Sequence, residues 1–184
     1  MDQGRLSMDR DLIDRAARAL AIEAVYLRDS RVRCRGGFLP QFIEEELSLV
    51  PQYKSGSTGH LISLQVNEAS TDNGPRLILL TFSAAVRLVD GEALTADEAG
   101  DDLAEDVQYL EIEAEFCAQY RLKPSADIEE LRPAIEEFGR FNLGYHVWPY
   151  WREFVQGTCA RMGIPPIPVP MYRLPNNSAA DAAE

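Results

Sequence analysis

The sequence predicts an α+β protein in which an antiparallel sheet precedes two helices along the chain. Two long stretches, 77–89 and 108–122, have apolar residues at every even position from Ile78 to Leu88 and from Leu110 to Leu122, with polar residues at several odd positions, which is the period of two of a half-buried strand. After Pro124 the apolar residues recur every three or four positions, which is the period of an amphipathic helix. Because strands come first and helices follow, the order favours α+β over alternating βαβ units.

The N-terminal part is predicted to hold an amphipathic helix followed by the first strand. Over 9–26 the apolar residues recur at helical spacing, with Asp and Arg between them. From Val25 to Cys34 the period changes to two, with an interruption at Asp29-Ser30, which predicts a strand. The stretch 38–59 has no clear period and carries no firm prediction.

Three further alternating stretches complete a predicted four-stranded antiparallel sheet. They are 61–67, 77–89 and 108–122, and an acidic loop over 90–105 joins the last two. On the final strand the even positions from Leu110 to Leu122 are apolar, whereas most odd positions are polar. One face of this sheet is therefore expected to be solvated.

Two helices are predicted after the sheet. Asp127 suits the N-cap of the first, although Pro133 favours either a later start near Leu131 or a kink. Pro149 suits the first turn of the second helix, and Gly163 suits its C-cap.

The C-terminal segment is expected to contain no regular secondary structure. Residues 164–170 read IPPIPVP and lack most amide donors, so they are predicted to be extended. Residues 174–184 are small and polar, and we expect a disordered tail.

Composition excludes several classes of function. The formal net charge of −12 disfavours binding to the phosphates of nucleic acid. No apolar run is long enough to span a membrane, and residues 1–10 lack the apolar core of a secretory signal. The cysteines, Cys34, Cys117 and Cys159, are few and widely spaced, which is typical of reduced cytoplasmic thiols. A soluble, cytoplasmic protein is expected.

Catalytic and metal-binding motifs do not emerge from the sequence. His60 and His146 are the only histidines, and neither has Glu or Cys at metal-ligand spacing. The motifs GxSxG, GxGxxG, HExxH and the P-loop are missing. A solvated strand face explains Glu111, Glu113 and Glu115 better than a pair of glycosidase carboxylates does. The sequence predicts no enzyme, no metal and no cofactor.

Two motifs resemble the SecB family of export chaperones. The stretch Trp148–Pro166 has the family's Phe-Pro-Tyr-Ala-Arg-Glu helix opening as WPYWRE, and its Pro-Pro close as RMGIPP. The stretch 25–33, VYLRDSRVR, is similar to the family's first strand for five positions. The resemblance covers about 25–170 and divides the chain into an N-terminal helical extension (1–24), a SecB-like domain (25–173) and a tail (174–184).

The resemblance implies an ATP-independent holdase that binds unfolded polypeptides or preproteins through apolar grooves and keeps them soluble for export. It also implies a homodimer or a tetramer built as a dimer of dimers. Two alternatives remain open. The N-terminal helix is similar to that of SecB-like chaperones encoded with toxin–antitoxin pairs, which makes an antitoxin a candidate partner. The other alternative is a protein-interaction module without chaperone activity.

The resemblance also suggests which residues bind clients and which dock the motor SecA. The candidate client-binding aromatics are Phe38, Phe42, Tyr53, Tyr145, Trp148 and Tyr172; Trp151 fits the helix core better. The candidate SecA-docking acids are Asp29, Glu111, Glu113 and Glu115. Arg33 stands where the family carries an acid, Arg31 adds positive charge to the same strand face, and the family's C-terminal tail sequence is missing. Weak SecA docking, or none, is therefore expected.

Overall fold

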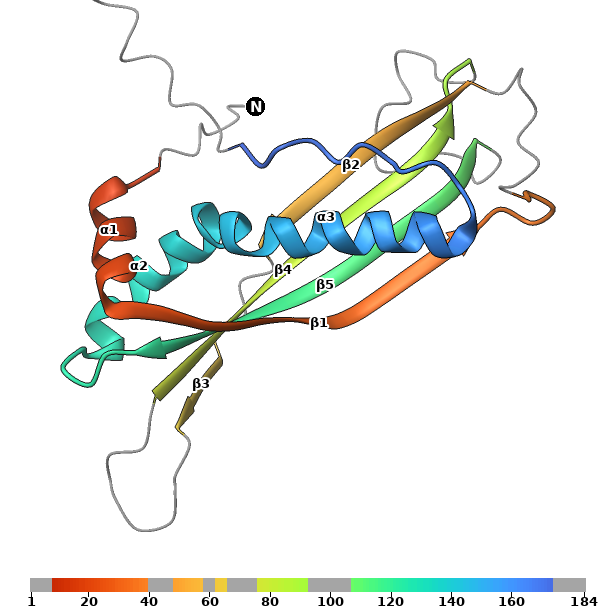
Figure 1. Cartoon of the computed structure of the whole chain (residues 1–184). Coiled ribbons are helices and arrows are strands. Elements are labelled where there is room, and N and C mark those ends of the chain that lie inside the picture. Colours follow the sequence, from red (N-terminus) through yellow and green to blue (C-terminus); the bar gives the residue numbers. More distant parts are fainter. Residues whose placement is uncertain (1–7, 40–47, 58–61, 66–75, 93–106, 174–184) are drawn as a thin grey trace, which may run out of the picture.

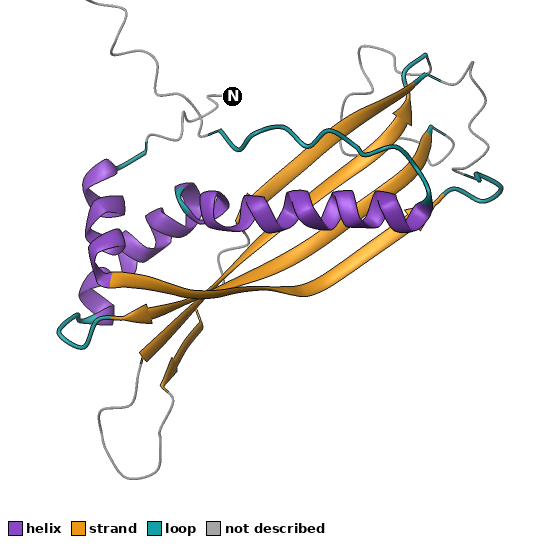
Figure 2. Ribbon diagram, in the orientation of Figure 1, coloured by secondary structure: helices purple, strands orange, loops and turns teal. Residues whose placement is uncertain are grey.

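An antiparallel sheet carrying helices on one face forms the body of the protein (Figure 1; Figure 2). The computed structural model describes residues 8–39, 48–57, 62–65, 76–92 and 107–173. The elements are α1 (Arg10–Ala19), β1 (Leu20–Cys34), β2 (Leu49–Ser57), β3 (Ile62–Gln65), β4 (Arg76–Asp90), β5 (Gln108–Leu122), α2 (Ile128–Phe141) and α3 (Leu143–Met162). The predicted α+β class and the antiparallel sheet are confirmed.

The sheet is four strands wide, as predicted, but two strands, β2 and β3, pair with β4 along the same edge. The order is β1-β5-β4-β2, and β3 pairs with the other end of β4. The predicted strand 61–67 corresponds to β3, which is only four residues long. The longer β2 lies in the stretch 38–59, to which the sequence assigned no firm structure.

The two central strands, β4 and β5, build the core. They pair from Arg76↔Leu122 to Val89↔Gln108, and their apolar even-numbered residues are buried together. Their odd-numbered residues lie on the opposite face and are mostly half-buried. The predicted division into an apolar face and a solvated face is confirmed.

The first helix is shorter than predicted. It ends at Ala19, and residues 20–26, which were assigned to the helix 9–26, belong to β1 instead. Leu20 already pairs with Leu122, so pairing with β5 overrides the helical spacing of the apolar residues. The predicted extension 1–24 thus shares its last five residues, 20–24, with the sheet.

The C-terminal helices have the predicted caps, but only the first of them begins where predicted. The Asp127 carboxylate accepts hydrogen bonds from the Glu129 and Glu130 amides, and α2 begins directly after it despite Pro133. The start predicted at Pro149 is wrong, because α3 begins at Leu143. Pro149 cannot donate to the Tyr145 carbonyl, and both residues are exposed, so water can satisfy that carbonyl. Gly163 ends α3 with a φ of 71°, as predicted for its C-cap.

The N-terminal helix is fixed to α2 at one end of the sheet (Figure 1). Glu137 is buried, and its carboxylate accepts a hydrogen bond of 2.8 Å from the Asp9 amide. Asp9 in turn caps α1 by accepting from the Leu12 amide. Within the described part of the chain, no helix combines the length and hydropathy needed to cross a membrane.

Candidate functional site

Residues 164–173, which we call the strap, run back from the end of α3 along the helix-bearing face of the sheet (Figure 1). They are extended and belong to no helix or strand, as predicted for 164–170. Ile164, Ile167 and Val169 are buried, whereas the intervening prolines are exposed. The strap therefore packs on the protein through its alternating aliphatic side chains.

Two side-chain donors hold the strap backbone. The Tyr53 hydroxyl of β2 donates to the Pro168 carbonyl, and the Trp148 Nε1 of α3 donates to the Pro170 carbonyl at 2.7 Å. These carbonyls are two residues apart, so in an extended segment they point to the same side. Burial raises the pKa of Tyr53, so its hydroxyl stays a neutral donor at physiological pH.

The end of the strap closes an aromatic cluster through Tyr172. Its ring centroid lies 5.1 Å from that of Tyr145, 5.2 Å from Trp148 and 6.1 Å from Phe82. The tip of the Tyr172 ring lies directly over Gly144, where an added Cβ would come within 2.1 Å of Cζ. Burial, and secondarily the neighbouring Tyr145, raises the pKa of Tyr172. Only a residue without a side chain at position 144 leaves room for this ring.

The structure brings together four of the six candidate client-binding aromatics: Tyr53, Tyr145, Trp148 and Tyr172. Phe38 packs instead against Tyr109, with centroids 5.2 Å apart, and Phe42 lies outside the described residues. Trp151 is fully buried in the core, as its helix position suggested.

Sequence reasoning missed the residues that complete this cluster. Phe82 is one of several apolar residues at even positions of the stretch 77–89, and no sequence pattern singles out Gly144. The alternation of aliphatic residues and prolines over 164–170 was the available signal for the strap's buried side, although it does not show what the strap packs against.

The candidate acidic residues lie on the other face of the sheet, where arginines of β1 pair with them. The distances are 3.2 Å for Arg28–Glu115, 3.9 Å for Arg31–Glu113 and 3.3 Å for Arg33–Glu111. Asp29 is next to this row, opposite Glu115 in the register, and its carboxylate accepts from the Ser30 amide. The three glutamates therefore do not form a purely negative surface.

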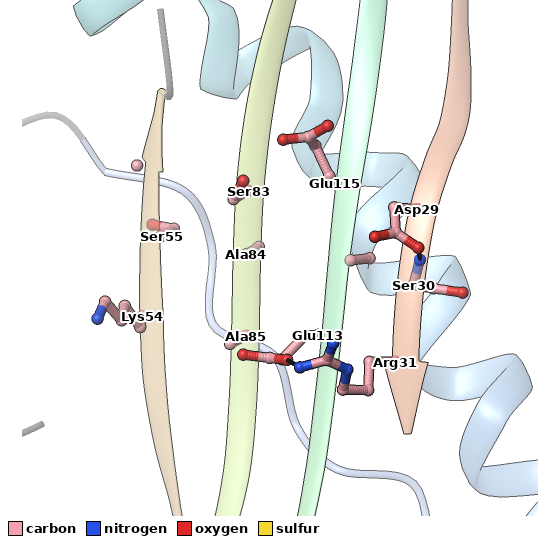
Figure 3. A pocket seen from close by; sticks show the side chains of 12 residues that line it. Asp29, Ser30, Arg31, Lys54, Ser55, Ser83, Ala84, Ala85, Glu113 and Glu115 are labelled. Carbon is pink, nitrogen blue, oxygen red and sulfur yellow. Dashed lines mark hydrogen bonds and ion pairs between the residues drawn. The ribbon is translucent and has the colours of Figure 1, made fainter. Parts of the chain in front are cut away.

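A shallow pocket of about 470 Å³ lies over this charged face (Figure 3). Its walls include Arg31 and Glu113 on one side and Lys54 of β2 on the other, and small side chains of β4, Ser83 and Ala85, line it between them. Both signs of charge border it, so its chemistry does not select an acidic or a basic ligand.

The polar groups with catalytic potential are internally satisfied. His146 Nδ1 lies 2.7 Å from the Tyr120 hydroxyl. Burial lowers the pKa of His146 and raises that of Tyr120, so a neutral tyrosine and a neutral imidazole share this hydrogen bond. His60 lies outside the described residues, and within those described no cluster of three His, Cys, Asp or Glu is placed to hold a metal. Cys117 and Cys159 are buried and Cys34 is exposed, all as free thiols.

Comparison with known proteins identifies the fold. No family model and no curated protein matches the chain. Among solved structures, the chain is similar to the Mycobacterium tuberculosis SecB-like chaperone Rv1957, solved in complex with a ChAD peptide from the antitoxin HigA1 (Rv1956). The TM-score is 0.59 at 14% sequence identity, and the similarity covers 91% of this chain and 100% of the other. The chain therefore has the fold of a SecB-like chaperone, as its two sequence motifs suggested.

Proposed function

We propose that this protein is an ATP-independent, SecB-like holdase that binds extended segments of unfolded polypeptides and keeps them soluble. The observation that carries the proposal is the SecB-like fold itself, shared over nearly the whole chain with a chaperone whose structure contains a bound peptide. The aromatic cluster around Trp148, which Tyr172 of the strap closes, supports the proposal because it offers a client apolar surface when the strap leaves it. We place the protein in the cytoplasm, without a cofactor or catalytic activity.

We further propose that the protein assembles through the edge of β1. Ile22, Leu27 and Val32 of this strand are 46%, 44% and 44% exposed, although their partners on β5 lie on the buried face. A long exposed edge with apolar side chains is an aggregation hazard for a monomer. Twofold pairing of β1 with a second copy would cover these side chains, and a dimer of such dimers would form the tetramer expected for this fold.

A dedicated antitoxin chaperone is the second candidate function. The similar structure contains a peptide from an antitoxin, and its similarity to this chain extends over 91% of the residues. SecA is the alternative partner, and we expect weak docking because Arg28, Arg31 and Arg33 neutralise the glutamates of β5.

Light scattering of several unrelated denatured proteins, diluted into buffer without ATP, tests the main proposal. We expect the protein to suppress the aggregation of most of these clients at near-stoichiometric concentration. Suppression of none, together with tight binding of one folded partner, would replace the holdase with an interaction module. Protection restricted to an antitoxin encoded beside it would favour the second candidate.

A further inference from the structure

We infer that the strap occupies the binding site of a client. Residues 167–172 fill a groove that also accepts an extended apolar segment of another polypeptide, with an aromatic residue in the place of Tyr172. This inference rests on the proposed function and names the segment that the site recognises. A client then binds by displacing the strap, so the strap limits the affinity of the resting protein.

The groove recognises a backbone in a way that depends little on sequence. Its two donors, the Tyr53 hydroxyl and the Trp148 Nε1, bind carbonyls two residues apart. Every extended polypeptide presents carbonyls at this spacing on one side. The strap prolines have no amide hydrogens, so the strap fits here as a chain of acceptors.

Side chains add a pattern to this backbone recognition. Ile167 and Val169 alternate into the protein, and Tyr172 enters the aromatic cluster three residues later. The bare backbone of Gly144 provides the space for the ring. The site therefore fits an extended segment with two aliphatic residues at alternate positions, followed by an aromatic residue. Segments of this kind are abundant in unfolded proteins.

The way the strap is held is compatible with displacement. It forms no ladder of backbone hydrogen bonds with a strand, because it belongs to no strand, and Met171 beside Tyr172 is 68% exposed. Its attachment to α3 nevertheless gives it a high effective concentration, on the order of millimolar for a short linker. A client must therefore overcome this internal competitor.

Peptide binding to the full-length protein tests the inference. The probes are a synthetic peptide with the sequence of residues 164–173 and the same peptide with alanine in place of the tyrosine. Tyr172→Ala removes the ring and leaves the rest of the strap sequence unchanged, so it weakens the internal competitor that the peptide must displace. We expect the tyrosine peptide to bind Tyr172→Ala roughly tenfold more tightly than the wild type, with little gain for the alanine peptide. Tyr150→Ala, which removes an exposed tyrosine of α3, is the matched control and should bind like the wild type.

Gly144→Ala provides a second, independent variant. Its methyl group expels the Tyr172 ring but also takes its space. Hydrogen exchange at the Val169 and Met171 amides should therefore become faster than in the wild type, while affinity for the tyrosine peptide should not rise. This variant keeps the test decisive if Tyr172→Ala fails to fold.

The outcomes separate this inference from the proposed function. Equal peptide affinities for the wild type and Tyr172→Ala, with aggregation suppression by both, would overturn the strap inference and leave the holdase. Unchanged hydrogen exchange in Gly144→Ala would also overturn it. If Tyr172→Ala binds the tyrosine peptide tightly while neither protein suppresses aggregation, the strap inference holds and the holdase function fails.

Discussion

The contact between Gly144 and Tyr172 leads to a prediction whose sign depends on a second residue. Replacing a glycine inside a helix by alanine normally stabilises a protein by up to about 1 kcal/mol. Here the new Cβ would lie within 2.1 Å of the Tyr172 ring, so the ring must leave. Its contacts with Phe82, Tyr145 and Trp148 would then be lost. Aromatic pairs contribute about 0.5–1.5 kcal/mol each, so Gly144→Ala should destabilise the wild type by about 1–3 kcal/mol in net terms.

In a Tyr172→Ala background, the Cβ added by Gly144→Ala clashes with no ring. Only the higher helix propensity of alanine then affects stability. Gly144→Ala should then stabilise by up to about 1 kcal/mol. Urea unfolding of the four proteins of this double-mutant cycle, at one fixed protein concentration, measures both free energies of unfolding. An equal stabilisation by Gly144→Ala in both backgrounds would show that Tyr172 does not pack on Gly144, and would refute the strap geometry.

Four further predictions follow from other contacts. Because burial lowers the pKa of His146, the folded state binds a proton less readily than the unfolded state. The free energy of unfolding, measured in urea, should therefore fall as the pH drops below about 6.5, and His146→Gln should flatten this dependence. Glu137→Ala removes the acceptor of the Asp9 amide, so it should lower the free energy of unfolding by about 1 kcal/mol and speed hydrogen exchange in α1. Glu136→Ala, at an exposed neighbouring position, should change neither quantity. Leu27→Lys on the exposed edge of β1 should shift sedimentation toward the monomer without loss of stability, whereas Tyr150→Lys on α3 should leave the assembly intact. An unchanged assembly in Leu27→Lys would exclude this edge as the subunit interface. Arg33→Glu breaks the pair with Glu111 and places an acid where SecB sequences carry one, so it should strengthen binding to SecA several-fold. An unchanged affinity would exclude this face as the docking site.

The central strands were predictable because their apolar period is long, and α2 was predictable because its apolar residues keep helical spacing on both sides of Pro133. Val86 and Ile112 each lie in a run of about a dozen residues in which every even-numbered position is apolar, so a one-residue slip would expose this apolar set. The start of α2 followed from Asp127, whose carboxylate caps it as its position suggested. These features depend on local sequence and on burial alone.

The elements that were misjudged depend on partners far along the chain. The β2 strand contains Pro51 and the polar run from Lys54 to Ser57, and it is stable because it pairs with β4 at the edge of the sheet. Leu20 and Ala24 fit both a helix and a strand, and pairing with β5 decides between them. Local periodicity contains no information about these pairings.

The candidate site was predictable as a set of residues but not as an arrangement. The aromatics Tyr53, Tyr145, Trp148 and Tyr172 were selected from the sequence, and the structure places them together. That the Tyr172 ring packs against Tyr145 and Trp148 depends on Gly144 and on the path of the strap. The pairing of the β5 glutamates with arginines likewise depends on the register of β1, which a bulge between Leu27 and Asp29 sets.

Hydrogen exchange of the protein with and without a permanently unfolded client, such as a reduced and carboxymethylated protein, tests the central claim most directly. The account predicts a complex that forms without ATP, slower exchange around Tyr53 and the first turns of α3, and faster exchange in the strap at Val169 and Met171. Failure to form a complex, or protection confined to the charged face around Glu113, would contradict it.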